Sequence, residues 1–384
     1  MVVTTDILFQ LLQVADGRRS RLDEPPTALQ WERLFEQSKE QAIVGICADG
    51  IERLPEEQRP PRKLLLQWGF ITARIEQRNT YLNGQTIRIF RKLNEDGFDA
   101  CLLKGQGVAA YYPNSLRRQS GDIDVWAMPK GMFATGNMDF DRCRKAIVEY
   151  AHECSADAEI CLHNIVFPVI RDIPMELHFL PFYFNSYFAT RRVKKYLRRQ
   201  AAHQFSNVTS LGVPCPTDEF NMVFLLAHIF RHFLQEGIGL RQVMDYYYLT
   251  NKWVLDGKLD DRKTMDRLRH DLKTLGLYRF CGAVMWVLQK VFGLEHERMI
   301  VKPDKVLGEL LLGKIISGGN FGHYMTDNPF ACKPDDGHVM RLYKRTMSGM
   351  QQFRHYPSEC IWNLVRIVEM FVILRFDKIK NNRE

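Results

Sequence analysis

The sequence predicts an α+β protein in which a small mixed β-sheet is flanked by two helical regions. Residues 1–95 and 216–384 carry apolar residues at three- and four-residue spacing, which is typical of amphipathic helices. Between them, residues 96–215 alternate short apolar runs with helical segments, as strands and helices of one unit do. We therefore expect an N-terminal helical region, an α/β core and a C-terminal helical domain with these boundaries.

The N-terminal region is expected to be helical along most of its length. Its helical segments are TDILFQLLQVA, PTALQWERLFEQSKEQAIVGICADGIERL and PRKLLLQWGFITARIEQRNTYLNGQTIRIFRKLNEDG. Pro60 and Pro61 separate the second segment from the third. Gly97 follows the last segment, at a position where glycine commonly ends a helix.

The core region alternates strands and helices. FDACLLKG predicts a buried strand, QGVAAYYP predicts one or two helical turns that end at Pro113, and IDVWAM predicts a second strand. DRCRKAIVEYAHE is an amphipathic helix. EICLHNIVFPVI and IPMELHFLPF predict two further strands joined by the turn RD. This order of elements predicts the small mixed sheet.

The C-terminal region begins with a helix start signal. Thr217 is suited to cap a helix, and Asp218 and Glu219 suit its first turn. Helical spacing then continues to the end of the chain, interrupted by the loop ISGGNFGHYMTDNPFACKPDDG. The tyrosine run at 246–248 is expected to pack within this helical region.

The composition is that of an ordinary globular protein, with 384 residues, 46% hydrophobic and 26% charged. The sequence contains no run of about 18 apolar residues, so we expect no transmembrane helix. The N-terminus lacks the basic start of a secretory signal. Nine scattered cysteines without a C-x-x-C motif favour reduced thiols in the cytoplasm over disulfides or a zinc ribbon. The net charge of +8 allows an anionic ligand such as a nucleotide or nucleic acid without requiring one.

A carboxylate pair marks the start of the second predicted strand. Because side chains alternate along a strand, Asp122 and Asp124 point to one face and Ile123 to the other. Two carboxylates at this spacing repel each other unless a cation lies between them, and Mg²⁺ prefers carboxylate oxygens together with substrate phosphates. A lone D-x-D pattern is a weak signal for such a site.

A second acidic strand strengthens the metal hypothesis. IPMELHF places Glu176 and His178 on one face of a strand, with Met175 and Leu177 on the face toward the core. The alternative is that this segment is a solvated edge strand, on which a Glu–His face needs no ligand.

The Lys-Gly turn, the D-I-D strand and the MELHF strand follow one another along the chain. Taken in this order, these segments resemble the bacterial, largely uncharacterised nucleotidyltransferase branch of the DNA polymerase β-like nucleotidyltransferase superfamily. The resemblance includes HIFRHFLQEGIGLRQVMD farther along and spans roughly residues 60–330. It implies a polymerase β-like core with a small mixed sheet. The residues that carry it are Lys104, Gly105, Tyr112, Pro113, Arg118, Asp122, Asp124, His163, Glu176 and His178.

The resemblance implies a metal-dependent catalytic site. Asp122 and Asp124 would bind divalent ions, Mg²⁺ or Mn²⁺. Glu176 would be the third carboxylate, either holding the catalytic ion or taking a proton from an acceptor hydroxyl. The superfamily more often has aspartate at this third position.

The resemblance also implies a nucleotide-binding set made of Lys104, Gly105, Arg118 and His178. Gly105 would let the backbone approach phosphates at a helix start, and Lys104 and Arg118 would offset the triphosphate charge. The superfamily usually has Gly-Gly or Gly-Ser at the turn where this chain has Lys-Gly. Either Lys104 replaces a phosphate-binding hydroxyl, or the nucleotide sits differently.

Two histidines in the helical region are further candidates. His228 and His232 lie one turn apart with Glu236 a turn beyond, which would suit zinc, but no H-E-x-x-H motif is present. Alternatively, these histidines line the cleft together with Arg241 and Asp245, or they are simply packed between helices.

Two other segments admit a functional or a structural interpretation. The basic run RRVKKYLRRQ at 191–200 either follows a phosphate backbone or is a solvated helix face. SGGNFGH at 317–323 is either a mobile loop over a site or a plain connection between helices.

The expected function is nucleotidyl transfer. With Mg²⁺, the protein would transfer a nucleoside monophosphate from an NTP such as ATP to an acceptor and release pyrophosphate. The acceptor, whether small molecule, RNA or protein, stays open. The alternatives are a toxin-like transferase acting on tRNA or protein, and a catalytically silent scaffold with the same fold.

Overall fold

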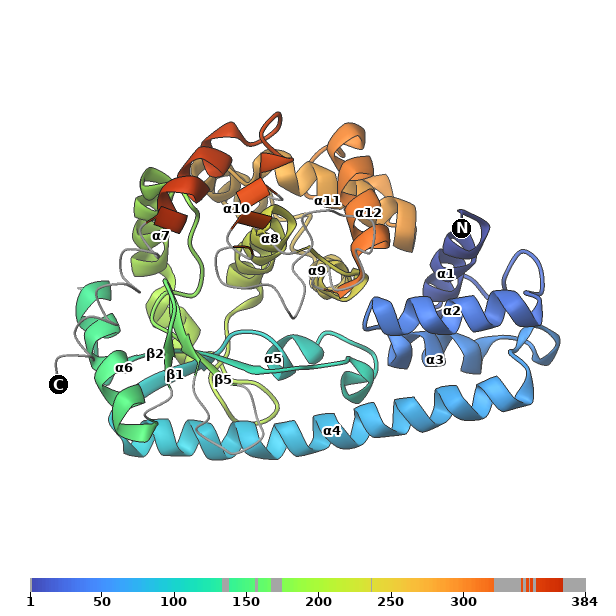
Figure 1. Ribbon diagram of the computed structural model, residues 1–384, viewed down its shortest axis with the longest axis horizontal. Helices are drawn as coiled ribbons and strands as arrows, with labels where there is room; N and C mark the ends of the chain where they lie inside the picture. The colour runs from blue at the N-terminus through green and yellow to red at the C-terminus, as the bar shows by residue number, and fades with distance from the viewer. Residues whose placement is uncertain are drawn as a thin grey trace.

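The structure is a computed structural model. It describes residues 2–132, 138–155, 158–166, 175–235, 237–320, 340, 343–344, 346–347 and 350–368. Its architecture is α+β, as the sequence predicts: a small mixed sheet lies between an N-terminal group of helices and a larger group of C-terminal helices (Figure 1). That the three regions expected from the sequence are separate domains stays a prediction.

The N-terminal helices rest on one long helix. In Figure 1, α4 runs along the lower edge of the molecule and spans nearly its whole width. Its 34 residues correspond to about 51 Å. The helices of this region are α1 (Val2–Ala15), α2 (Ala28–Glu40), α3 (Val44–Arg53) and α4 (Arg62–Glu95), with a 3-10 turn η1 (Glu56–Gln58).

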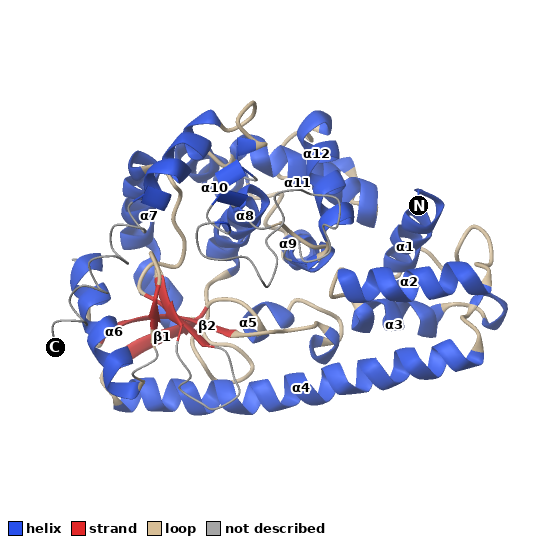
Figure 2. Ribbon diagram, in the orientation of Figure 1, coloured by secondary structure: helices blue, strands red, loops and turns tan. Residues whose placement is uncertain are grey.

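The sheet joins segments that are distant in the chain. Its strand order is β1-β2-β5-β4-β3, in which β2 and β5 run parallel and the other neighbours run antiparallel. Figure 2 shows the sheet above one end of α4. The strands are β1 (Phe98–Leu102), β2 (Ile123–Pro129), β3 (Glu159–Ile160), β4 (Asn164–Val166) and β5 (Met175–His178).

The remaining helices enclose the sheet and extend above it (Figure 2). Short elements follow β1, namely α5 (Gln106–Ala109) and η2 (Ser115–Arg117). The others are α6 (Phe140–Cys154), α7 (Tyr187–Ser206), α8 (Asp218–Gln235), α9 (Leu240–Leu255), α10 (Arg262–Leu275), α11 (Tyr278–Phe292), η3 (His296–Arg298) and α12 (Lys305–Gly318).

Trp126 shows which face of β2 meets these helices. Its ring lies 5.0 Å from that of Phe205 at the end of α7 and 6.0 Å from that of Phe220 in α8, measured between centroids. Because alternate residues share a face, Asp124 points to the same side, two residues nearer the start of the strand. On this face of β2, the apolar contacts of Trp126 are therefore followed by the carboxylate of Asp124.

Several local predictions are confirmed. Gly97 ends α4 with a φ of 88°, a left-handed conformation that suits glycine. Thr217 caps α8, its hydroxyl accepting a hydrogen bond from the Phe220 amide at 3.3 Å. The tyrosine run at 246–248 is buried in α9.

Other predictions were wrong in their boundaries. The second N-terminal segment is two helices, because the chain reverses between α2 and α3 at Ala42, which has a φ of 55°. EICLHNIVFPVI contains two strands, β3 and β4, separated by a turn at 161–163. The edge-strand alternative for β5 is wrong as well, since β5 pairs with β2 on one side and β4 on the other.

Some predictions lie outside the described residues. These are the turn RD and the part of the C-terminal helix beyond 368. The loop ISGGNFGHYMTDNPFACKPDDG is described only at its start, where Ser317 and Gly318 still belong to α12.

Gly45 allows α3 to approach the segment before β2. A Cβ at this position would lie 2.3 Å from the Arg117 carbonyl oxygen, a contact that the backbone cannot relieve without moving. We expect Gly45→Ala to lower the free energy of unfolding by about 1–3 kcal/mol, the usual cost of overpacking. Urea unfolding followed by circular dichroism measures it.

Gly69 provides the matched control. It lies on the exposed side of α4, where an added Cβ would meet no other atom within 4 Å. Gly69→Ala should therefore raise stability by up to ~1 kcal/mol through helix propensity. Equal stability of the Gly45→Ala variant and the unaltered protein would show that the close approach does not exist.

Candidate functional site

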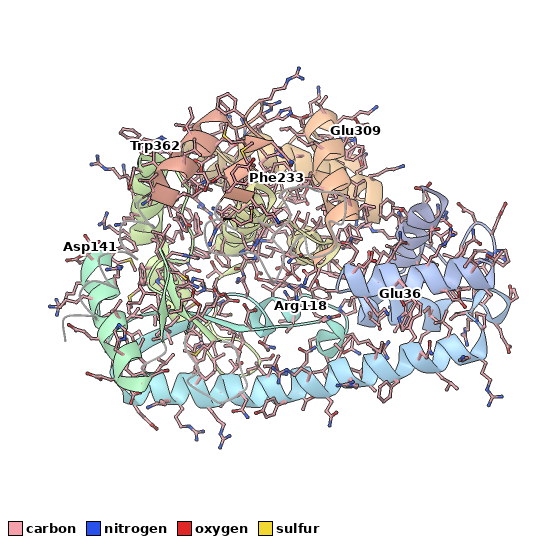
Figure 3. All side chains as sticks on the ribbon, viewed as in Figure 1. Glu36, Arg118, Asp141, Phe233, Glu309 and Trp362 are labelled. Atoms are coloured by element: carbon pink, nitrogen blue, oxygen red, sulfur yellow. The ribbon has the colours of Figure 1, made fainter. Side chains whose placement is uncertain are left out.

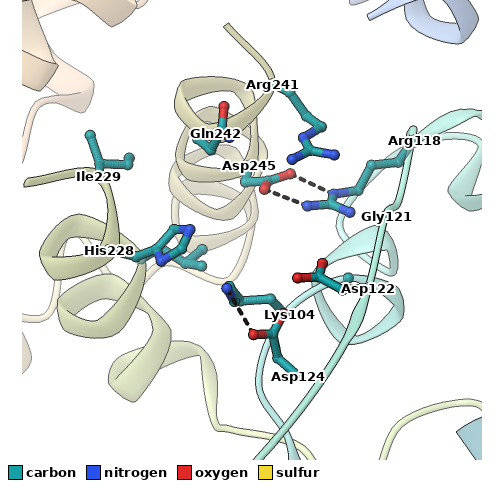
Figure 4. A pocket seen from close by; sticks show the side chains of 12 residues that line it. Lys104, Arg118, Gly121, Asp122, Asp124, His228, Ile229, Arg241, Gln242 and Asp245 are labelled. Atoms are coloured by element: carbon teal, nitrogen blue, oxygen red, sulfur yellow. Dashed lines mark hydrogen bonds and ion pairs between the residues drawn. The ribbon is translucent and has the colours of Figure 1, made fainter. Parts of the chain in front are cut away.

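A narrow charged pocket opens at the start of β2, between the sheet and helices α8 and α9 (Figure 4). Its cavity volume is about 30 Å³, so the charged groups on its walls lie close to one another. The residues that line it are Lys104, Gly105, Arg118, Gly121, Asp122, Asp124, Leu225, His228, Ile229, Arg241, Gln242 and Asp245.

The parallel pairing of β2 with β5 brings the acidic residues together. Asp124 and Glu176 are register partners, and His178 lies two residues farther along the same face of β5. The Nε2 atom of His178 lies 3.0 Å from Asp124 Oδ1 and 3.3 Å from Glu176 Oε2. Asn164 in β4 donates a hydrogen bond to Glu176 Oε2 at 2.7 Å.

These contacts determine the charges of the cluster. Burial alone would raise the pKa of Glu176, but the hydrogen bond from His178 and the charges of His178 and Lys104 hold it at about 2. Burial alone would lower the pKa of His178, but its bonds to Asp124 and Glu176 outweigh this and raise it. The contacts with Asp124 and Glu176 therefore favour the protonated form of His178 in the absence of a metal ion.

Lys104 supplies a second cation to the same carboxylate. Its Nζ lies 2.9 Å from Asp124 Oδ1 (Figure 4). Burial opposes its charge, yet the charges of Asp124, Asp122 and Glu176 raise its pKa. The backbone makes this approach possible, since Leu103 N donates to the Asp124 carbonyl at 2.9 Å and Gly105 turns the chain with a φ of 60°.

Asp122 lines the pocket and lies just before β2 begins. The charge of Asp124 is the largest influence on its pKa, followed by burial, and both raise it. Lys104 and Arg241 act in the opposite direction. Repulsion between the two aspartates is thus only partly offset, which is the condition that a further cation would relieve.

Arg118 is held by the helical region. Its Nε and Nη2 atoms donate to the two carboxylate oxygens of Asp245 in α9, each at 2.7 Å, and both side chains are buried. Tyr112 donates to Asp245 Oδ1 at 2.6 Å. From the opposite side, Asn79 in α4 donates to the carbonyls of Leu116 and Arg118 at 2.7 and 2.6 Å.

The helical wall of the pocket carries Arg241 and His228. Arg241 donates to the Gln119 carbonyl at 2.7 Å. Burial and the charges of Lys104, Arg231 and Arg241 keep the pKa of His228 well below its usual range. His163 contacts Arg231, and burial with that charge lowers its pKa in the same way.

The predicted residues divide into two groups in space. Lys104, Gly105, Arg118, Asp122 and Asp124 line the pocket. Glu176 and His178 lie beside Asp124 on the neighbouring strand. Ligand atoms of Asp124, Glu176 and His178 all lie within 4.8 Å of one another, so this trio has the geometry of a metal site, with Asp122 next to it.

Sequence reasoning missed the residues that orient this site. Asn164 holds Glu176, and Arg231 contacts His163. Both stand inside the segments HNIVF and HIFRHF that carry the resemblance, which is the signal that would have indicated them. Asn79 had no such signal, because its partners lie 37 and 39 residues away.

The other candidates are placed as follows. His228, Arg241 and Asp245 line the pocket, whereas His232 does not; its ring centroid lies 4.3 Å from that of His228. Glu236, the third residue of the zinc hypothesis, lies outside the described residues. Within the described ranges, no helix is long and apolar enough to cross a membrane.

The chain matches the family described as uncharacterised nucleotidyltransferase over residues 27–293. This match covers more than half of the sequence and includes the sheet, the pocket and helices α8 and α9. The protein therefore belongs to this nucleotidyltransferase family. No curated protein and no solved structure matches it.

The Arg118–Asp245 pair predicts a large loss of stability when only one partner is removed. Asp245→Asn leaves the guanidinium buried without its counter-charge, so the free energy of unfolding should fall by about 3–5 kcal/mol. Urea unfolding measures the change. As a control, Arg267→Gln breaks the exposed pair with Glu219 and should cost less than about 1 kcal/mol.

A double variant separates the charge effect from loss of packing. Arg118→Met with Asp245→Leu removes both charges, and it should be more stable than Asp245→Asn alone. A double variant that is less stable than the single one would show that the pair contributes more than its desolvation costs.

Proposed function

We propose that the protein transfers a nucleoside monophosphate from an NTP, with ATP as the first candidate, to an acceptor in a Mg²⁺-dependent reaction. The observation that carries this proposal is the cluster of Asp124, Glu176 and His178, with Asp122 beside it, at the edge of a pocket lined by cations. An acceptor oxygen attacks the α-phosphorus, the bond to the bridging oxygen breaks, and pyrophosphate leaves.

The donor set suits a hard divalent ion. Asp122, Asp124 and Glu176 offer carboxylate oxygens, the ligands that Mg²⁺ and Mn²⁺ prefer. The ammonium of Lys104 already lies against Asp124, so a positive charge is stabilised at this position. When bound, a divalent ion would neutralise charge on the phosphates and on the attacking oxygen.

The electrostatics favour one of the two roles considered for Glu176. A carboxyl group with a pKa of about 2 is a weak base at neutral pH, far from the value that general-base catalysis favours. Asn164 and His178 also bind it. Glu176 is therefore better suited to hold a cation than to accept a proton from the acceptor hydroxyl.

The nucleotide phosphates would meet the cationic side of the pocket. With a metal ion held by Asp124, the ammonium of Lys104 would no longer be needed by that carboxylate and would be available to the triphosphate. Arg241 lines the same pocket from α9. Arg118 has its Nε and Nη2 bound to Asp245, so we assign it mainly to shaping the pocket.

The described cysteines are free thiols, which fits a cytoplasmic enzyme.

The activity test is pyrophosphate release with Mg²⁺ and each of the four NTPs, measured with a coupled colorimetric assay. Asp122→Asn and Asp124→Asn should each lower the rate by about 100-fold or more, because each removes a charge that the transition state needs. Asp266→Asn, at an exposed position of helix α10, should leave it unchanged.

Two results would contradict the proposal. One is the absence of both Mg²⁺-dependent NTP binding and pyrophosphate release, which would favour a catalytically silent scaffold. The other is full activity of both aspartate variants with an intact fold, which would place the chemistry elsewhere.

A second prediction concerns Lys104 and needs no turnover. Because Lys104 competes with metal for Asp124, Lys104→Met should bind Mn²⁺ about tenfold or more tightly in the absence of nucleotide. It should also bind NTP more weakly. Isothermal titration calorimetry measures both, with Lys305→Met on the exposed side of α12 as the control. Weaker Mn²⁺ binding by the variant would exclude the competition.

A further inference from the structure

Helix α4 presents a basic and aromatic face on its outer side. In Figure 3, side chains along the lower edge of α4 point away from the rest of the molecule. At 3.6 residues per turn, the residues concerned fall within about 140° of the helix circumference and span about 32 Å. We define the α4 outer face as Phe70, Arg74, Arg78, Tyr81, Arg88 and Arg91.

The aromatic rings of this face are unusually exposed. Phe70 is 64% exposed and Tyr81 is 45% exposed, although burial of such rings normally stabilises a fold. They lie eleven residues apart, which is just over three full turns, and so they point in nearly the same direction.

Each ring is covered by a guanidinium from an adjacent turn of the helix. The Cζ of Arg74 lies 5.8 Å from the centroid of Phe70, and the Cζ of Arg78 lies 5.6 Å from that of Tyr81. A planar cation over a planar ring forms a platform on which a nucleobase can stack. The face carries two such platforms.

Charge on this face has a single sign. Glu76 is the one acidic residue between Phe70 and Arg91 in the sequence, and its carboxylate turns inward to accept a hydrogen bond from Arg117 at 2.8 Å. Within the described part of the chain, Arg88 and Arg91 are exposed and have no carboxylate partner.

The basic helix α7 is different, although its sequence is more densely charged. Arg199 pairs with Asp271 at 2.6 Å, and Arg198 donates to the Met138 carbonyl at 3.0 Å. Lys194 lies 3.8 Å from Asp141. Much of the charge in RRVKKYLRRQ thus serves contacts within the fold, whereas the cations of α4 face solvent.

We propose that the α4 outer face binds single-stranded nucleic acid. Arg88 and Arg91 would contact backbone phosphates, and the Phe70–Arg74 and Tyr81–Arg78 platforms would stack unpaired bases. This binding goes beyond nucleotidyl transfer, because it requires neither metal nor NTP and lies on the side of α4 opposite the pocket.

The spacing of apolar groups disfavours an anionic membrane as the partner. Interfacial helices bury one continuous apolar stripe and keep their cations along its borders. Here Arg74, Gln77 and Arg78 lie between Tyr81 and the exposed pair Leu66 and Phe70 on the same face, so the apolar groups form no continuous stripe along the helix.

Fluorescence anisotropy of a labelled single-stranded RNA of about 15 nucleotides, longer than the ~32 Å face, tests the proposal. A DNA strand of the same sequence and vesicles with phosphatidylserine are titrated in parallel, all without metal or NTP. The logarithm of the affinity should fall with the logarithm of salt concentration with a slope of about −1.4, as the two phosphate contacts of Arg88 and Arg91 require.

Two double variants examine the two kinds of contact. Arg88→Gln with Arg91→Gln should reduce the salt slope by about 1.4. Phe70→Ala with Tyr81→Ala should weaken binding at least about tenfold while leaving the slope unchanged. The control removes two exposed cations from α10, Arg262→Gln with Lys263→Gln, and should bind like the unaltered protein. Thermal melting confirms that each variant is folded.

Each outcome decides the matter. Equal binding of RNA and DNA, with the expected losses in both variants, supports the proposal. Absence of binding at low salt, equal losses in the control, or binding to the vesicles alone overturns it. Because Asp124→Asn should bind RNA normally, a failure of the catalytic proposal is distinguishable from a failure of this one.

Discussion

One buried carboxylate organises the site. Asp124 is 1% exposed and accepts contacts from both Lys104 and His178. A charge buried to this degree costs several kcal/mol unless it is compensated, so the elements that bring Lys104 and His178 must be in place before the carboxylate is stable. The turn at Gly105 places Lys104 against Asp124, and the pairing of β2 with β5 places His178 against the same carboxylate. The same carboxylate that organises the ligand-free fold is the one best placed to receive a metal ion, and fold and proposed chemistry therefore depend on one group.

The pocket is shared between regions that are far apart in the chain. Residues before β2 supply Arg118, and α9 supplies Asp245, 127 residues later. Helix α4 supports the same segment from below through Asn79, while α3 approaches it closely at Gly45. Every one of these contacts involves the stretch from 114 to 120, which has little regular structure of its own. Its conformation is set by its neighbours. The family match, residues 27–293, includes α2, α3 and α4 as well as the sheet.

The local features of the site could be predicted from sequence, and its assembly could not. Alternation along a strand is enough to place Asp122 and Asp124 on one side, and Glu176 with His178 on one side. The strand order cannot be predicted from any local pattern in the sequence. This order places Asp124 opposite Glu176 and makes β5 an interior strand. Helix boundaries failed at Ala42 because a left-handed alanine leaves no trace in an apolar pattern. The partner of Arg118 was likewise hidden: Asp245 was suspected near the cleft, but nothing in the sequence pairs it with an arginine 127 residues away.

The parallel pairing of β2 and β5 also has a consequence for the order in which the protein acquires its function during synthesis. Parallel strands cannot be joined by a tight turn, and Asp124 must wait for a partner 52 residues farther along, as the register Asp124↔Glu176 shows. Domains generally fold as units while the chain emerges from its N-terminus. The carboxylate cluster therefore cannot form until residue 178 has left the ribosome, and the pocket cannot close until α9 has followed. A nascent chain carries Asp122 and Asp124 long before it has a site, and so a chain interrupted within α8 would have the carboxylate motif without the complete pocket.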